Sequence, residues 1–154
     1  MVRRRVTVSV ALACILWLAA PAQAQPLPAT PGCTAATELV PALCDASLPP
    51  IARVHIGPPA AAGAQSGPQE PACRRFAPGE PALRRFWAGA HAVSERDWRH
   101  ALDWTACHVS GTATLADGRR ASWQVSATRM GVWQVAGEEP VYLYCPDCGF
   151  APFW

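Results

Sequence analysis

The sequence predicts an α+β protein in which two short helices precede a four-stranded antiparallel sheet, with a proline-rich, largely irregular N-terminal segment before both. Two observations favour this class. The hydrophobic period changes from about 3.6 to about 2 residues near Thr105. Residues 25–82 contain 12 prolines, which long helices and inner strands do not tolerate. We therefore expect a compact α+β domain over 81–154, after a Pro/Ala/Gly-rich segment over 25–80.

Two helical stripes open the predicted domain. The first joins apolar residues three or four positions apart, namely Leu83, Phe86, Trp87 and Ala90. Ser94 is the expected N-cap of the second helix, because its hydroxyl can accept a hydrogen bond from the backbone N–H of Asp97. The second stripe comprises Trp98, Ala101, Leu102 and Thr105.

The first two strands are predicted as a hairpin that turns at Asp117-Gly118, because apolar and polar residues alternate over 107–115 and 121–128. A two-residue turn would mix the two faces. A three-residue loop over 116–118, with Gly118 in the left-handed conformation, keeps them apart. This loop pairs Ala113 with Ala121, Gly111 with Trp123, and Val109 with Val125, and the glycine leaves room for the indole.

Two more strands are expected over 131–135 and 141–145, joined by a turn over 136–140. The resulting layout is similar to the small helix-plus-sheet modules of β-lactamase-inhibitor proteins and of outer-membrane assembly lipoproteins. The similarity is one of architecture alone and implies no function.

Residues 1–24 have the features of a cleavable secretory signal peptide. Arginines at 3–5 precede an apolar stretch over 6–20, and Ala22 and Ala24 fit the requirement of signal peptidase for small residues. The alternative is an uncleaved membrane anchor, but 15 residues are fewer than the roughly 20 that a membrane-spanning helix needs. The expected mature chain begins at Gln25, is periplasmic or secreted, and has no membrane span.

Signal cleavage would also change the charge of the protein. It removes the three arginines at 3–5 and no acidic residue, so the formal net charge falls from +2 to −1. The mature chain therefore offers no support for binding to nucleic acid or to an anionic membrane.

Six cysteines follow the signal peptide, and an even number in a small exported chain predicts disulfides. These disulfide candidates are Cys33, Cys44, Cys73, Cys107, Cys145 and Cys148. The first two flank a short segment and are expected to close a small loop over 33–44. The sequence leaves the connectivity open, and one arrangement that it allows joins Cys107 to Cys148 and Cys73 to Cys145.

The Cys-Pro-Asp-Cys motif at 145–148 allows three roles for its cysteines. A redox dithiol needs a helix N-terminus to lower the thiolate pKa, and the few residues after Cys148 cannot form a useful helix. A zinc site needs four ligands, whereas the neighbours Cys107 and His108 point to opposite faces of a strand. Structural disulfides are the favoured interpretation, and we expect no cofactor and no metal.

No catalytic constellation is recognisable in the sequence. His91, Ser94 and Asp97 lie close together but match no nucleophile-elbow or triad signature. Glycine-rich phosphate loops are absent from the sequence as well. We therefore expect a protein that is not an enzyme.

The outward face of the predicted sheet is the candidate binding surface, because short uncharged side chains form hydrogen bonds readily and lose little entropy on docking. Its residues are His108, Ser110, Thr112, Thr114, Ser122, Gln124, Ser126, Thr128, Tyr142 and Tyr144. The alternative is an ordinary solvated face. The aromatic residues Phe150, Phe153 and Trp154 either pack over the end of the sheet or insert into a partner.

These observations predict an exported, disulfide-bonded, non-enzymatic binding module of the inhibitor, immunity or envelope-assembly type. Its expected partner is a protein of the cell envelope. The alternative is an exported thiol-redox or zinc-binding protein that acts through the motif at 145–148.

Overall fold

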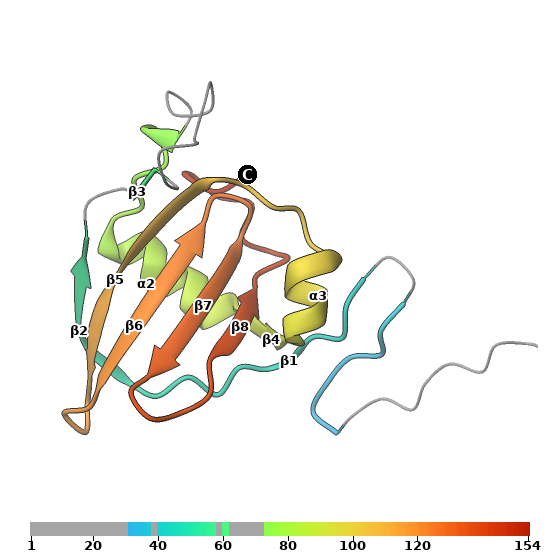
Figure 1. Ribbon diagram of the computed structural model, residues 1–154, viewed down its shortest axis with the longest axis horizontal. Helices are drawn as coiled ribbons and strands as arrows, with labels where there is room; N and C mark the ends of the chain where they lie inside the picture. Colours follow the sequence, from blue (N-terminus) through green and yellow to red (C-terminus); the bar gives the residue numbers. More distant parts are fainter. Residues whose placement is uncertain (1–30, 38–39, 58–59, 62–72) are drawn as a thin grey trace, which may run out of the picture.

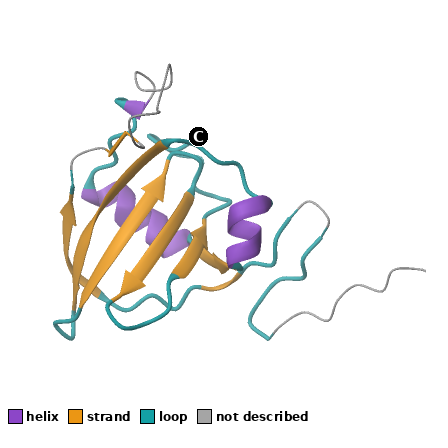
Figure 2. Ribbon diagram, in the orientation of Figure 1, coloured by secondary structure: helices purple, strands orange, loops and turns teal. Residues whose placement is uncertain are grey.

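The protein is described by a computed structural model over residues 31–37, 40–57, 60–61 and 73–154. One antiparallel sheet dominates this part of the chain (Figure 1). Its strands are β1 (Cys44–Asp45), β2 (Ile51–Ile56), β3 (Ala60–Ala61), β4 (His91–Val93), β5 (Cys107–Leu115), β6 (Arg120–Ser126), β7 (Met130–Val135) and β8 (Val141–Tyr144). Helix α2 (Glu80–Gly89) lies behind the sheet and the short helix α3 (Glu95–His100) lies beside β8 (Figure 2).

The strand order is β1-β4-β8-β7-β6-β5-β2, and β3 pairs with β5 outside this path. The prediction of a four-stranded α+β sheet was therefore wrong, because the described chain is mainly β, with seven strands in sequence across the sheet. The expected similarity to small helix-plus-sheet modules loses its basis with it. The predicted hairpin and the two strands after it form the four neighbours β5 to β8 in the middle of the sheet.

Strand β2 comes from the proline-rich segment and was missed because the prolines were counted over the whole segment. They flank this strand and do not interrupt it. Ile51, Val54 and Ile56 pack against the core, whereas Arg53 and His55 alternate with them and are exposed. A strand at the edge of a sheet tolerates prolines at its two ends, because each proline removes only its own backbone N–H donor.

Strand β4 was missed for a different reason. Its three residues are too few to show a hydrophobic period. In the sequence it lies between the two helices, and in the sheet it pairs with β8. Two residues of the segment before β2 add β1 to its other side. Helix α3 ends at His100, so the helical stripe expected as far as Thr105 is shorter than predicted.

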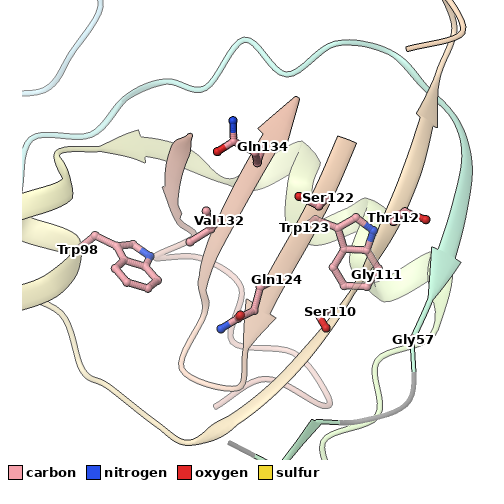
Figure 3. Close-up of a pocket in the computed structure, with 10 residues that line it drawn as sticks. All are labelled: Gly57, Trp98, Ser110, Gly111, Thr112, Ser122, Trp123, Gln124, Val132 and Gln134. Atoms are coloured by element: carbon pink, nitrogen blue, oxygen red, sulfur yellow. The ribbon is translucent and has the colours of Figure 1, made fainter. Parts of the chain in front are cut away.

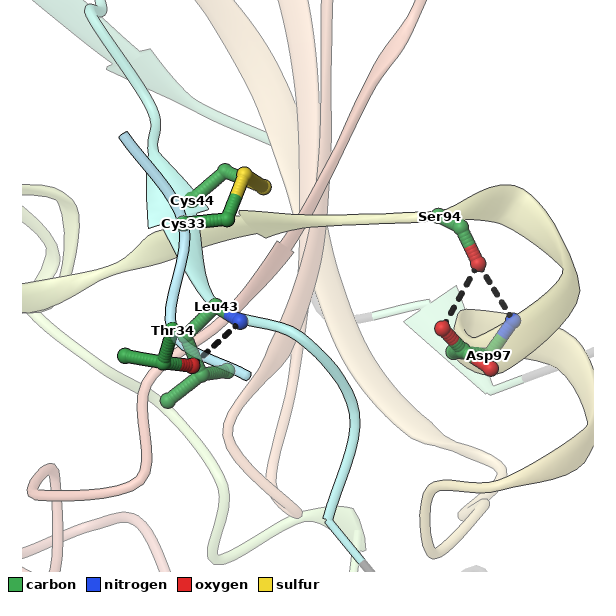
Figure 4. Close-up of a disulfide and its surroundings, with 6 residues drawn as sticks. All are labelled: Cys33, Thr34, Leu43, Cys44, Ser94 and Asp97. Atoms are coloured by element: carbon green, nitrogen blue, oxygen red, sulfur yellow. Dashed lines mark hydrogen bonds between the residues drawn. A yellow bond between two sulfur atoms is a disulfide. The ribbon is translucent and has the colours of Figure 1, made fainter. Parts of the chain in front are cut away.

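The predicted hairpin register is confirmed. Ala113 pairs with Ala121, Gly111 with Trp123, and Val109 with Val125. Gly118 has a φ of 86°, the left-handed conformation that the three-residue loop requires. The N-cap at Ser94 is also confirmed, since its Oγ accepts a hydrogen bond of 3.0 Å from the backbone N–H of Asp97 (Figure 4).

The core lies between the sheet and α2. The predicted apolar stripe supplies its helical side, with Leu83, Phe86 and Trp87 buried. The Trp87 ring meets the rings of Trp123 and Trp133 edge to face, at centroid distances of 5.3 and 5.4 Å. We call the side of the sheet that faces α2 the inner face and the opposite side the outer face.

The predicted signal segment, residues 1–24, lies outside the described residues. Within the ranges that the structure describes, no helix has the length and apolar character needed to cross a membrane.

Candidate binding face

The outer face is built from cross-strand rows of side chains, because residues in register on adjacent antiparallel strands lie on the same side of the sheet. One row contains Arg53, Thr114 and Arg120. The next contains His55, Thr112, Ser122 and Gln134, and the third contains Ser110, Gln124, Val132 and Tyr142. The sheet thereby brings together residues that are separated by more than half of the described chain.

A groove of about 500 Å³ lies over the second and third rows. Figure 3 shows its lining residues spread over the sheet, with Trp98 on one side and Gly57 on the other. The lining set is Gly57, Trp98, Ser110, Gly111, Thr112, Ser122, Trp123, Gln124, Val132 and Gln134. No charged side chain is in this set, so the groove offers hydroxyl and amide groups beside an aromatic wall.

Trp98 projects from α3 and forms that wall. Its ring centroid lies 5.3 Å from that of Tyr142, and the two ring planes are tilted by 48°. Hydrogen bonds from Arg99, and secondarily from Tyr142, hold the pKa of Glu95 below its usual value. These contacts tie the helix to the third row of the outer face, and they fix the position of the indole at the rim of the groove.

The indole nitrogen of Trp98 is buried and has no hydrogen-bond partner in the described part of the chain. The indole nitrogens of Trp87, Trp123 and Trp133 are also buried without a partner among the described residues, so this state does not set Trp98 apart. In Figure 3 the nitrogen is on the side of the ring that faces Val132 of the groove.

Six of the ten residues predicted for this surface do not line the groove, namely His108, Thr114, Ser126, Thr128, Tyr142 and Tyr144. His108 directs its Nδ1 to the carbonyl oxygen of Ala106, at 3.0 Å. Ser126 and Thr128 contact each other at the turn after β6, at 3.2 Å. Tyr144 lies under the guanidinium of Arg129, whose carbon is 5.9 Å from the ring centre.

Six residues that line the groove were not in the predicted surface: Gly57, Trp98, Gly111, Trp123, Val132 and Gln134. Trp98 was assigned to a helical stripe, and only the fold shows that this stripe reaches the outer face. Val132 and Gln134 alternate with the buried Trp133 within β7, so the period of two residues could have placed them on the outer face.

The six cysteines form three disulfides, Cys33–Cys44, Cys73–Cys107 and Cys145–Cys148. The first joins the two ends of the segment that was expected to form a loop (Figure 4). The arrangement with Cys107 bound to Cys148 was wrong. Cys107 begins β5 next to the residues that lead into α2, so Cys73 is the cysteine that reaches it.

The Cys145–Cys148 disulfide is buried, with the two residues only 1% and 2% exposed. A Cβ atom added at Gly89, the last residue of α2, would lie 3.3 Å from the sulfur of Cys145. The disulfide thus packs against a helix C-terminus, whose partial negative charge disfavours a thiolate. A reactive thiol usually lies at a helix N-terminus and is accessible, and this pair has neither property.

The described residues contain no group of three or more His, Cys, Asp or Glu side chains placed to hold a metal ion. No protein-family model, no curated protein and no solved structure matches this chain. Fold and site together define a small, mainly β, disulfide-bonded protein with an open polar groove on one face of its sheet.

Proposed function

We propose that this protein is an exported, non-enzymatic binding module that docks a protein partner of the cell envelope on its outer face. The observation that carries the proposal is the uncharged groove between Trp98 and β2. Exposed Thr112, Ser122 and Gln124 offer hydrogen bonds without the desolvation cost of a charged group. The half-buried Trp98 adds a rigid aromatic surface of the kind that is enriched at binding sites.

Placing a photo-crosslinking amino acid at Gln124 tests this proposal in the native host. We expect one discrete protein adduct, identified by mass spectrometry, because Gln124 is exposed in the groove. The same crosslinker at Ala88, which is exposed on α2 behind the sheet, is the matched control and should give no such adduct.

The substitution Ser122→Arg adds bulk and charge to the groove next to that position. It should reduce the Gln124 adduct by about tenfold or more and leave the free energy of unfolding unchanged. A tenfold loss of binding corresponds to about 1.4 kcal/mol, and a clash of an arginine side chain with a docked partner costs at least that much. Equal adducts from Gln124 and Ala88, or no adduct from either, would contradict docking on the outer face.

The intact mass of the protein isolated from its native compartment tests export and the role of the cysteines. We expect a chain that begins at Gln25 with a mass lower by six hydrogen atoms, two for each disulfide. Mild reduction without denaturant should allow alkylation of Cys33 and Cys44 first, because they are partly exposed. Alkylation of Cys145 and Cys148 before any reductant is added would instead favour the thiol-redox alternative.

A further inference from the structure

A second recess, of about 360 Å³, lies at the corner of the outer face where β2, β5 and β6 meet. Its side chains come from the first two rows, and it shares Thr112 with the uncharged groove. The lining residues are Arg53, Val54, His55, Thr112, Ala113, Thr114 and Arg120. We call the set Arg53, His55 and Arg120 the basic corner.

The basic corner has no acidic residue in its lining. Among the described residues, no ion pair joins Arg53 or Arg120 to a carboxylate, whereas Arg84, Arg99 and Arg119 are each paired. Two arginines in one row of the recess, with a histidine in the next row, repel one another unless an anion lies between them. In the recess these positive charges therefore lie close together with no carboxylate of the described residues beside them.

Two carboxylates near the β5–β6 turn, Asp117 and Glu138, are already bound by another arginine. Arg119 donates from Nε to Asp117 at 2.6 Å and from Nη1 to Glu138. The backbone N–H of Arg119 and then its side chain lower the pKa of Asp117, which keeps that carboxylate ionised and engaged in the turn. Both acids are thus used by the β5–β6 turn and its neighbour.

We infer that the basic corner binds carboxylates of an acidic, extended peptide segment of the partner. The inference rests on the proposed function, and it specifies the chemistry of the partner that docks on the outer face. Guanidinium groups bind carboxylates through paired, charge-assisted hydrogen bonds. The hydroxyls of Thr114, between the two arginines, and of Thr112, beside His55, can add further donors.

The geometry of β2 favours a peptide over other anions. Arg53 and His55 are alternate residues on one strand, so their Cα atoms are about 6.6–6.8 Å apart. Alternate carboxylates on an extended segment have the same spacing. Within the described chain β2 pairs only with β5, so it ends the sheet path, and an extended peptide beside such an end strand can also reach its backbone groups.

The experiment uses the full mature chain labelled with ¹⁵N and a hexaglutamate peptide as the probe. We expect hexaglutamate to shift the amide signals of Thr112 and Thr114, with hexaglutamine producing no shift. The substitutions Arg53→Gln and Arg120→Gln should each raise the Kd for hexaglutamate by about tenfold, because each removes a charge-assisted contact. Arg96→Gln removes the same charge from exposed α3 and should leave the Kd unchanged.

Four results would overturn this inference. One is no hexaglutamate binding, and another is equal weakening by Arg96→Gln, which would indicate a general charge effect. The third is tighter binding of inorganic phosphate or of an oligogalacturonate, which would assign the corner to phosphate or to an acidic glycan. A Gln124 adduct that persists in the Arg53→Gln, Arg120→Gln double variant would also overturn it, yet leave docking on the outer face intact. If the protein without any arginine substitution gives no Gln124 adduct, the proposed function itself is contradicted.

Discussion

Replacing Gly111 with alanine is expected to destabilise the protein by about 3 kcal/mol or more, at the upper end of the range for overpacked cores. A Cβ atom at this position would lie 2.0 Å from the backbone oxygen of His55 and 2.6 Å from Cζ2 of Trp123. The backbone oxygen cannot rotate away, so β2 would have to separate from β5. Thermal unfolding followed by circular dichroism should show a Tm lower by about 10 °C or more.

Gly149→Ala is the matched control for this substitution. No atom lies within 4 Å of the Cβ that it would introduce, so its Tm should remain within a few degrees of the original value. The double variant Gly111→Ala, Trp123→Phe tells the two contacts apart. A smaller ring relieves the contact with the indole but leaves the one with His55, so stability should not be restored. Unchanged stability in Gly111→Ala would contradict the close approach of β2, and with it the placement of the basic corner.

The centre of the sheet could be predicted because its pattern is local. Each strand from β5 to β8 carries its own alternation of apolar and polar residues, and short turns join them. The hairpin register followed from one requirement, that the buried face stay apolar, and the pairing of Gly111 with Trp123 satisfied it. Both observations use residues that are close together in the sequence.

The borders of the sheet could not be predicted in this way. Strand β2 pairs with β5 across a long stretch of chain, and its strand character depends on contacts such as the hydrogen bond from Arg84 to the carbonyl oxygen of Ile51, at 3.1 Å. Strand β4 owes its conformation to its pairing with β8 and with β1. Tertiary pairing decides such short strands, whereas propensity and proline content describe only the isolated chain.

The same distinction explains the candidate site. The hydroxyl rows of β5 and β6 were visible as an alternating pattern, so Ser110, Thr112 and Ser122 could be assigned to the outer face. The basic corner was not visible, because Arg53 and Arg120 become neighbours only when β2 and β6 lie on either side of β5. Apolar and basic residues alternate in the sequence IARVHI at 51–56. A strand assigned there would have placed Arg53 and His55 on the outer face.

Replacing Phe153 with alanine is expected to cost about 3–5 kcal/mol, as for other buried phenylalanines. Its ring stacks on Phe86 and meets Phe76 edge to face, both at 5.5 Å, so it belongs to the core beneath the sheet. Trp154→Ala is the natural control, because that ring is 54% exposed and makes one edge contact, with Phe76. Urea unfolding should show a large drop in midpoint for the first variant and a small one for the second.

This pair of variants also separates the two roles considered for the aromatic tail. A tail that inserts into a partner would make both substitutions costly for binding and neither costly for folding. The structure predicts the opposite for Phe153, because its backbone N–H donates to the carbonyl oxygen of Phe150 at 2.8 Å and Trp154 donates to Ala127 at 3.0 Å, which holds the tail across the end of β6. A Phe153→Ala variant as stable as the original protein would show that the tail does not complete the core.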